Sequence, residues 1–369
     1  MKAKIYLLFC QLSSIVSHFF SRNSSISLSK SLDIKLVFLA TILISCNQKS
    51  VLPTPPLDHE ALNLPVLEKK VDENIDPYFY ETTAITSEKG PESITRNIIQ
   101  DDKGLLWFAS WQGVMSYDGK EYTNYTNRDN LKRFHMFAVY QDSKGGYWFG
   151  SVRGGLYRYD GKNWEHLSSK KELTNDIISC FMEDSKGNLW IGTADGAVRY
   201  NWKTFEKFGK EEGLINGDIN DIVEDKNGVL WFGTRDELYT FQNEKFSIFK
   251  ASNGNSLFNV RTIIKDQQDR MWYGGNNGLW MFDDGEEEQI MTAFTGYIYE
   301  SPSGIVYAGI ANGSGRNWTL NRFETVSAPL NEMNHKEIRE QEGQIFGIME
   351  DKDGVLWYGT ERGVVQVME

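Results

Sequence analysis

One short phrase recurs along the chain and limits what the chain can fold into. It is a tryptophan with Asp six residues before it and, in every copy but that of Trp272, Gly three residues before it, as in DSKGNLW and DKNGVLW. The tryptophans stand at Trp107, Trp148, Trp190, Trp231, Trp272 and Trp357. The first four intervals are 41 or 42 residues and the last is about twice as long, with a weaker copy around Tyr307 inside it. The sequence therefore contains seven repeats.

Each repeat predicts four short strands. An apolar strand ends at the Asp, and D-x-x-G is typical of a hairpin turn in which the carboxylate accepts local N–H groups and Gly adopts a positive φ. The tryptophan strand and two further strands follow. Such a unit at this period predicts a propeller blade. We expect an all-β fold, a seven-bladed β-propeller of four-stranded antiparallel blades, with each tryptophan packed between neighbouring blades.

The two ends of the repeat region suggest how the ring closes. The last repeat stops after its third strand, GVVQVME, while residues 78–94 resemble the text of a fourth strand. We expect residues 78–85 to supply the outer strand of the seventh blade, so that an N-terminal strand closes the ring. Between the sixth and seventh repeats, NEMNHKEIREQ is expected to form either a short helix or a tolerated insertion.

Two of the repeats carry a family resemblance. IISCFMEDSKGNLWIGTADGAVRY and INDIVEDKNGVLWFGTRDELYTF resemble the two-component regulator propeller repeat, whose pattern is roughly I-x-x-I-x-x-D-x-x-G-x-L-W-I-G-T-x-x-G-L. The resemblance covers about residues 78–369. It implies the propeller fold and a general ligand-sensing character, because such propellers often form the periplasmic half of membrane histidine kinases. No kinase or DNA-binding sequence follows the repeats, so the signalling output is not carried over.

The N-terminal sequence predicts export. KSLDIKLVFLATILISC has a basic start and an apolar run too short to cross a bilayer, which is typical of a signal peptide. Its end, LISC, resembles a bacterial lipobox, which implies cleavage before Cys46 and lipidation of that residue. The alternative is an ordinary signal peptide with a chance cysteine. We expect the protein in the bacterial cell envelope, anchored to the membrane by lipid at Cys46, on the periplasmic side of the outer membrane.

Three parts of the chain follow from these patterns. Residues 1–45 form the signal region, of which residues 1 to about 29 are surplus. Either the start codon is assigned too early, or these residues form a separate amphipathic segment. Residues 46–76 contain four prolines and predict an extended linker behind the lipid anchor. Residues 77–369 form the propeller.

Charge and composition exclude several function classes. The formal net charge is −12 and the basic residues of the first 46 make the remainder more acidic still, which argues against a nucleic-acid partner. The three cysteines form no CxxC motif or Cys/His cluster, so a structural zinc site is not expected. The recurring aspartates are spread one per blade and lack the D-x-D-x-D-G pattern of a calcium loop. We expect no metal and no cofactor.

Positions that differ between repeats are the candidates for binding. The turn after the tryptophan strand and the loop that leads into the inner strand lie on one face of a propeller. There they would surround the mouth of the central channel. The candidates are Arg96, Asn97, Trp111, Gln112, His135, Arg153, Asp176, Asp195, Asn220, Asp221, Arg235, Arg261, Asn276 and Arg362. Such residues suit a polar ligand, such as a glycan, or a loop of a partner protein. The alternative is a solvated rim of charge.

No catalytic motif is evident, so we do not expect an enzyme. The chain has no G-x-S-x-G, H-E-x-x-H or phosphate loop. His135 with Asp176 or Asp221 could imitate the channel site of the streptogramin lyases, and this is the least favoured hypothesis. The favoured function is a lipid-anchored extracytoplasmic propeller that binds a ligand or a protein at one face as a sensing component. The main alternative is a scaffold subunit of an envelope protein complex.

Overall fold

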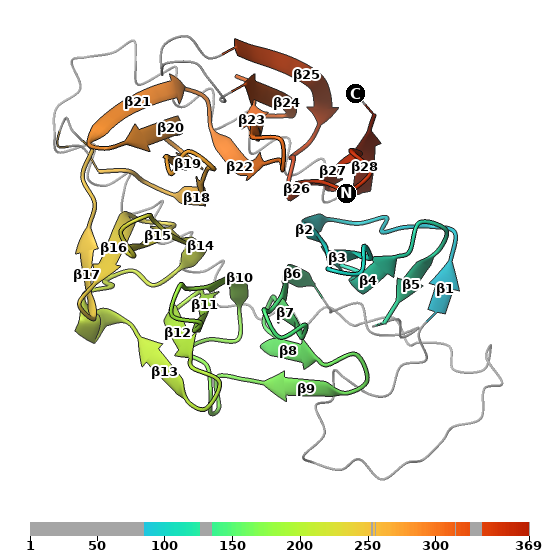
Figure 1. Cartoon of the computed structure of the whole chain (residues 1–369), viewed down its shortest axis with the longest axis horizontal. Helices are drawn as coiled ribbons and strands as arrows, with labels where there is room; N and C mark the ends of the chain where they lie inside the picture. The colour runs from blue at the N-terminus through green and yellow to red at the C-terminus, as the bar shows by residue number, and fades with distance from the viewer. Residues whose placement is uncertain are drawn as a thin grey trace, which may run out of the picture. The chain divides into compact units, whose positions relative to one another are not determined.

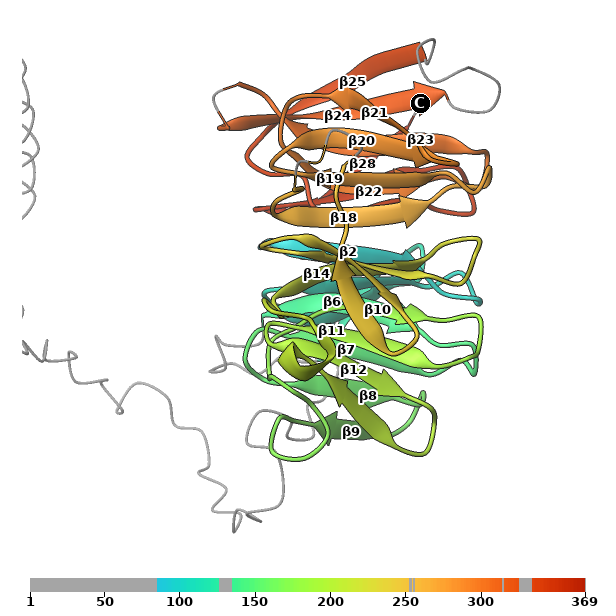
Figure 2. The same cartoon turned by 90° about the vertical axis from the view of Figure 1, so that its left-hand side faces the viewer.

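The architecture is a ring of seven small antiparallel sheets. The computed structural model describes residues 85–368 apart from 126–134, 252–253, 255, 314 and 325–333. Figure 1 shows the sheets around a central axis with one strand of each sheet nearest the centre, and Figure 2 shows the ring from its edge. The seven-bladed all-β prediction is confirmed, although the blades have three to five strands rather than four throughout.

From the innermost strand outward, the strands of each blade follow chain order, except that β1 (Ile85–Ser87) lies outside β5 (Tyr122–Asn124) in the first blade. The inner strands are β2 (Thr95–Gln100), β6 (Met136–Gln141), β10 (Ile178–Glu183), β14 (Ile219–Glu224), β18 (Val260–Lys265), β22 (Thr295–Glu300) and β26 (Ile348–Glu350). The second strands are β3 (Leu106–Ser110), β7 (Tyr147–Ser151), β11 (Leu189–Thr193), β15 (Leu230–Thr234), β19 (Met271–Gly275), β23 (Ile305–Ala311) and β27 (Leu356–Thr360).

The outer half of each blade completes the sheet. The third strands are β4 (Gly113–Tyr117), β8 (Leu156–Tyr159), β12 (Gly196–Tyr200), β16 (Leu238–Gln242), β20 (Gly278–Asp283), β24 (Asn317–Glu324) and β28 (Gly363–Val367). The fourth strands are β5 (Tyr122–Asn124), β9 (Trp164–Leu167), β13 (Phe205–Phe208), β17 (Lys245–Ile248), β21 (Glu286–Met291) and β25 (Asn334–Glu342). A short N-terminal strand, β1 (Ile85–Ser87), and a 3-10 turn, η1 (Lys210–Glu212), are the remaining elements of the described residues.

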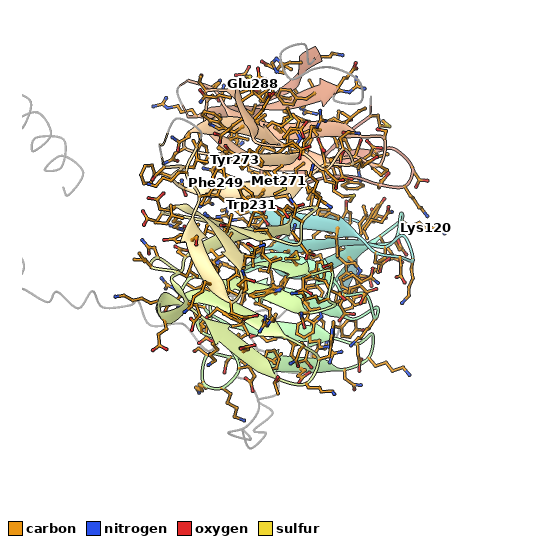
Figure 3. All side chains as sticks on the ribbon, turned by 60° about the vertical axis from the view of Figure 1, so that its left-hand side comes forward. Lys120, Trp231, Phe249, Met271, Tyr273 and Glu288 are labelled. Carbon is orange, nitrogen blue, oxygen red and sulfur yellow. The ribbon has the colours of Figure 1, made fainter. Side chains whose placement is uncertain are left out.

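The core lies between the blades. Each repeat tryptophan packs against the inner and second strands of the next blade; Trp231, for example, is clustered with Met271 and Tyr273 of the fifth blade, beside Phe249 (Figure 3). Trp357 of the last blade packs in the same way against the first blade. The prediction that the tryptophans fill the junctions is confirmed. Burying one such side chain stabilises the fold by roughly 2 to 3 kcal/mol.

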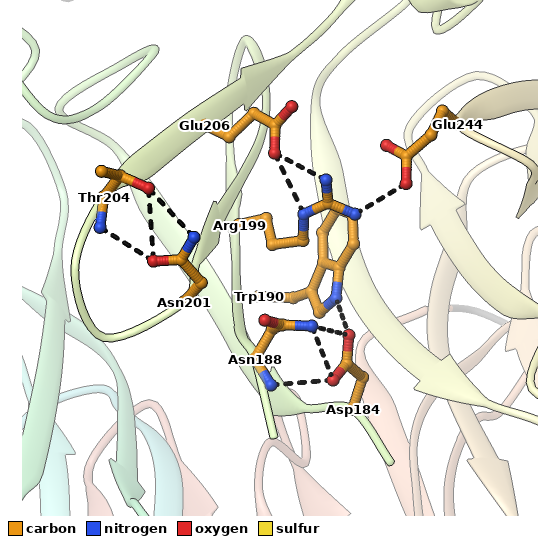
Figure 4. A network of polar contacts seen from close by, with 8 residues as sticks. All are labelled: Asp184, Asn188, Trp190, Arg199, Asn201, Thr204, Glu206 and Glu244. Atoms are coloured by element: carbon orange, nitrogen blue, oxygen red, sulfur yellow. Dashed lines mark hydrogen bonds and ion pairs between the residues drawn. The ribbon is translucent and has the colours of Figure 1, made fainter. Parts of the chain in front are cut away.

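A hydrogen bond joins the recurring turn to the tryptophan of the same repeat. In the third blade, Asp184 Oδ1 accepts the N–H groups of Lys186 and Asn188 at 3.0 and 2.8 Å, and Oδ2 accepts the indole N–H of Trp190 at 2.8 Å (Figure 4). The same indole bond, at 2.7 to 3.0 Å, joins Asp and Trp in the six blades that contain both. We call this pair of interactions the Asp–Trp latch.

The predicted cap of the turn is confirmed, and the indole bond is an addition to it. Gly187 takes the expected positive φ of 78° in the third blade, and Asp269 takes this conformation, at 63°, where the fifth blade lacks the glycine. Asp tolerates the left-handed region better than most residues do. In the sixth blade Ser301 replaces the aspartate, and its hydroxyl accepts the N–H of Ile305 at 3.1 Å.

Ring closure differs from the prediction. Strand β1 pairs with β5, with Ser87 opposite Tyr122, so the first blade has five strands and the seventh has three in the described residues. Ile85 therefore does not complete the seventh blade, and residues 78–84 lie outside the described residues. The outer edge of β5 offers unpaired backbone groups, and the N-terminal strand takes this edge.

A shorter segment meets the seventh blade instead. A Cβ on Gly363 of β28 would lie 1.9 Å from the carbonyl oxygen of Pro91. Gly155 has the same relation, at 2.4 Å, to the last residue of its own fourth strand, Leu167. Pro91 thus occupies the place where a fourth strand of the seventh blade would end.

The insertion before the seventh repeat is also not helical where it is described. Residues 334–342 form β25, which pairs with β24 along its whole length. A helix as short as NEMNHKEIREQ is only marginally stable on its own, and pairing with the edge of β24 is favoured instead.

Candidate functional site

A β-bulge at the start of the inner strand builds the channel wall. In six blades the register between the inner and second strands shifts by one residue at this point. The bulged residues are Arg96, Phe137, Ser179, Asn220, Arg261 and Gly296. A bulge leaves its extra residue unpaired and re-aims its side chain. These six residues, together with Phe346 of the seventh blade, line a single cavity of about 250 Å³.

Arg96 is held by aromatic rings. Its guanidinium carbon lies 4.1 Å from the ring centroid of Phe137 and 4.7 Å from that of Phe346. Its buried Nε has no hydrogen-bond partner within the described residues. Burial, followed by the positive charges of Arg261 and Arg235, lowers the pKa of Arg96 to about 10. The side chain stays charged at neutral pH in surroundings that disfavour the charge.

Arg261 lines the same cavity from the fifth blade. Burial, followed by the charge of Arg235, lowers its pKa, and the carboxylate of Asp218 opposes this shift. One Nη donates to Asn220 Oδ1 at 3.4 Å. Asp218 itself is paired with Arg235, whose Nε lies 2.8 Å from a carboxylate oxygen. Neither Arg96 nor Arg261 forms an ion pair within the described part of the chain.

Three other polar residues of the cavity join the inner strands of neighbouring blades. Asn97 Oδ1 accepts the N–H of Val139 at 2.8 Å. Asn220 donates to the carbonyl of Val260 at 2.8 Å. Asp221 Oδ2 accepts the N–H of Ile263 at 2.8 Å, and burial raises the pKa of this carboxyl to about 7. Asn97, Asn220 and Asp221 therefore have a structural role, because their hydrogen bonds join neighbouring blades.

Similarity to known proteins agrees with the fold and the repeat. The family model described as two component regulator propeller matches residues 172–195, 213–236 and 340–362. The chain carries two component regulator propeller repeats. The matched segments contain the Asp–Trp latch of the third, fourth and seventh blades. No curated protein matches the sequence of the chain.

Solved structures share the architecture of this regulator propeller at low sequence identity. The extracellular domain of the putative hybrid two component system BT3049 from B. thetaiotaomicron is 17% identical, with a TM-score of 0.62, over 74% of this chain and 39% of that one. The chain thus matches about two fifths of the length of that domain. Virginiamycin B lyase from Staphylococcus aureus is 14% identical, with a TM-score of 0.58, over 77% of this chain and 98% of the lyase.

A third similar structure is PorZ, a surface component of the type-IX secretion system of Porphyromonas gingivalis. It is 14% identical, with a TM-score of 0.50, over 77% of this chain and 44% of PorZ. At these identities the similarity shows the fold of the regulator propeller alone. The described residues contain no helix long and apolar enough to cross a membrane.

The predicted site residues of the regulator propeller divide into two groups. Five of them line the cavity: Arg96, Asn97, Asn220, Asp221 and Arg261. The other nine lie outside the cavity lining, and we call them the rim: Trp111, Gln112, His135, Arg153, Asp176, Asp195, Arg235, Asn276 and Arg362.

Several rim residues are engaged locally. Gln112 accepts the N–H of Glu92 at 2.6 Å, Asn276 accepts from Asn259 at 2.8 Å, and Arg362 lies 3.7 Å from Glu342. The N–H of Asp195 donates to Thr193 at 3.0 Å, and Arg153 has a positive φ of 77°.

The arrangement of His135 differs from that of a catalytic pair. Its ring stacks on Trp111 with centroids 4.1 Å apart, and burial lowers its pKa. The carboxylate of Asp176 accepts the N–H and hydroxyl of Ser169 at 2.6 and 2.8 Å. Asp221 is bound to backbone N–H groups. Within the described residues, no group of three or more His, Cys, Asp and Glu side chains could hold a metal ion.

Sequence reasoning missed the apolar half of the cavity. Phe137, Phe346 and Tyr297 line it beside the arginines. One signal was present in the sequence, because every bulged residue lies five residues before the turn Asp or its replacement. Comparing this single position across the seven repeats would have brought Arg96, Phe137 and Phe346 together.

Proposed function

We propose that this regulator propeller is a non-enzymatic recognition module that binds a ligand or a protein where the channel opens, as a sensing component. The fold shared with an extracellular domain of a two component system supports the sensing part. One observation supports the binding part above all. Arg96 and Arg261 line the central cavity without an ion pair among the described residues, although burying an unpaired charge is unfavourable.

Substitutions on the rim test the recognition function. The purified full chain is screened by thermal shift against oligosaccharides and cell-wall fragments. Trp111→Ala and Arg235→Ala replace rim residues and no residue of the cavity lining, and Arg235→Ala also removes a positive charge that acts on Arg96 and Arg261. A ligand of the channel mouth raises the melting temperature of the wild type and is weakened in these variants. If no compound stabilises the wild type, and no protein partner is found as described below, the proposed function is wrong.

A scaffold role in an envelope protein complex is the second candidate. Ile215 and Phe258 lie in the loops that lead into β14 and β18, with exposed fractions of 67% and 46%. Exposed large apolar side chains beside a channel mouth favour a protein partner. The fold shared with PorZ agrees with this role. Size-exclusion chromatography of detergent extracts should show a large complex that Ile215→Ser with Phe258→Ser dissociates; elution of the wild type as a monomer excludes it.

We also propose that the protein is held in the cell envelope by lipid on Cys46, on the periplasmic side of the outer membrane. The basic start and short apolar run before LISC support this. Residues 46–76 lie outside the described residues. Cys46→Ala should abolish metabolic labelling with palmitate and release the protein from the membrane fraction. Labelling that survives the substitution rules out the anchor.

A further inference from the structure

The central cavity is lined by two arginines, neither of which forms an ion pair within the described residues. Its charged side chains are Arg96, Arg261 and Asp221, in a protein whose formal net charge is −12. Both carboxylate oxygens of Asp221 accept backbone N–H groups, from Ile222 and Ile263. Two partly buried guanidiniums that form no ion pair within the described residues carry unfavourable charge. The missing partner is therefore expected to come from outside the chain.

We propose that the cavity binds an oxyanion, a carboxylate or a phosphate group, between Arg96 and Arg261. This inference rests on the proposed recognition function and names the chemistry of its ligand. Strands β2 and β18, which carry the two arginines, lie on opposite sides of the ring centre (Figure 1). An anion at the centre is thus approached from two sides by positive charge.

Arg96 has the surroundings of a preorganised anion receptor. Phe137 and Phe346 come from the second and seventh blades, on either side of the first, and their rings contact the guanidinium. Rings stacked on a guanidinium fix its plane and leave its N–H edges for hydrogen bonding. Such an edge matches two oxygens of one carboxylate or phosphate. The buried Nε also lacks a hydrogen-bond partner within the described residues.

The guanidinium of Arg261 and one neutral hydroxyl complete the site. Arg261 makes one long bond, to Asn220 at 3.4 Å, which leaves most of its five N–H groups available. The hydroxyl oxygen of Tyr297 accepts from Asn97 Nδ2 at 3.4 Å. Burial raises the pKa of Tyr297, so the hydroxyl keeps its proton and can donate it. The cavity thus offers an anion two kinds of donor, the guanidinium groups of Arg96 and Arg261 and the hydroxyl of Tyr297.

The size of the cavity limits the ligand. Its volume of about 250 Å³ lies just below the usual range of small-molecule sites, roughly 300 to 1,000 Å³. An oligosaccharide does not fit into it. A small acid does fit, and so does the acidic group of a larger ligand whose remainder lies over the rim.

Two simple probes test the inference. Inorganic phosphate and succinate are titrated separately into the full chain, with sodium chloride added to keep ionic strength constant, and binding is followed by calorimetry and thermal shift. At least one probe should bind saturably. Phosphate alone identifies a phosphate ligand, and succinate alone identifies a carboxylate ligand. If neither binds the wild type more than chloride does, the inference is overturned.

Variants place the bound anion. Arg96→Gln and Arg261→Gln should each raise the Kd by about tenfold or more, which is the usual effect of losing a charge-assisted hydrogen bond. Arg96→Lys keeps the charge but loses the planar edge, and should fall between wild type and Arg96→Gln. Lys120→Gln removes the same charge from an exposed turn that projects from the ring (Figure 3), and should bind like the wild type.

The outcomes separate the inference from the function on which it rests. Equal weakening by Lys120→Gln shows only a general charge effect and overturns the anion site. Suppose that a neutral ligand binds and that its affinity depends on Trp111 but not on Arg96 or Arg261. The proposed recognition function then stands, and the proposed anion site is wrong. Because Arg261→Gln is an independent second variant, loss of folding in Arg96→Gln still leaves a decisive result.

Discussion

Two positions five residues apart in every repeat behave in opposite ways. The turn position is Asp in six blades and Ser in one, and the bulge position is Arg, Phe, Ser, Asn, Arg, Gly and Phe in chain order. Both belong to the same strand and turn. The turn aspartate accepts two backbone N–H groups and an indole, while the residue at the bulge position lines the cavity and has no repeated partner. Repetition within this ring therefore marks structural constraint, and variation marks the positions open to a ligand.

Removing one latch should have the largest effect on stability. Asp101 accepts the indole of Trp107 at 3.0 Å, the hydroxyl of Tyr147 at 2.7 Å and two backbone N–H groups. Asp101→Ala leaves these buried donors unsatisfied, and we expect a loss of about 4 kcal/mol in the free energy of unfolding. Chemical denaturation measures this.

The matched control lies five residues earlier, in strand β2, which ends just before Asp101. Arg96→Gln removes the contacts with two rings but also relieves an unfavourable buried charge. We expect its free energy of unfolding to stay within about 1 kcal/mol of the wild type. If Arg96→Gln and Asp101→Ala destabilise the protein equally, the distinction between frame and channel positions fails.

The comparison between turn and channel residues can be extended by the pH dependence of stability, to which the channel residue Asp221 contributes. Burial raises its pKa to about 7 from an ordinary value of 3.8, so the folded state binds more protons than the unfolded state between these values. Its contribution to stability is present below pH 4 and is lost as the pH rises through 7. Because Asn does not titrate, the variant Asp221→Asn does not lose stability in this way as the pH rises. The stability of the variant relative to wild type should rise by on the order of 2 kcal/mol from pH 5 to pH 8.

Parallel denaturation curves at pH 5, 6, 7 and 8 measure this difference. Asp195→Asn, an exposed-turn substitution on the rim, serves as the control and should show no such trend. A constant difference between Asp221→Asn and wild type at all four pH values would contradict the prediction.

The smallest effect is expected at the exposed junctions between blades. Glu183 accepts the N–H and hydroxyl of Ser143 in the preceding blade, at 3.0 and 2.6 Å. Because this pair is solvent-exposed, Glu183→Ala should cost only about 1 kcal/mol. A melting-temperature loss as large as that of Asp101→Ala would show that the outer contacts, rather than the latch, hold neighbouring blades together.

The sequence predicted the frame better than the site for a physical reason. The repeat period, the turn and the packing of Trp190 depend on local spacing, which can be read directly. The channel depends on a one-residue register shift, which no spacing within a single repeat reveals. A regular strand would place Arg96 and Asn97 on opposite faces, whereas the bulge lets both line the cavity. The partners of Asn97 and Asp221 lie on the next blade, so their structural role was also hidden.

The junction between the last and first blades joins parts of the ring that are not consecutive along the chain. There the N–H of Gly347 donates to the carbonyl of Arg96 at 2.9 Å, and the ring of Phe346 contacts the guanidinium of the same arginine. Arg96 thus joins the first and last blades through its backbone carbonyl and lines the cavity with its side chain. Opening this junction would separate Phe346 from Arg96 and so disrupt the cavity. A molecule bound at Arg96 would therefore stabilise the closed ring.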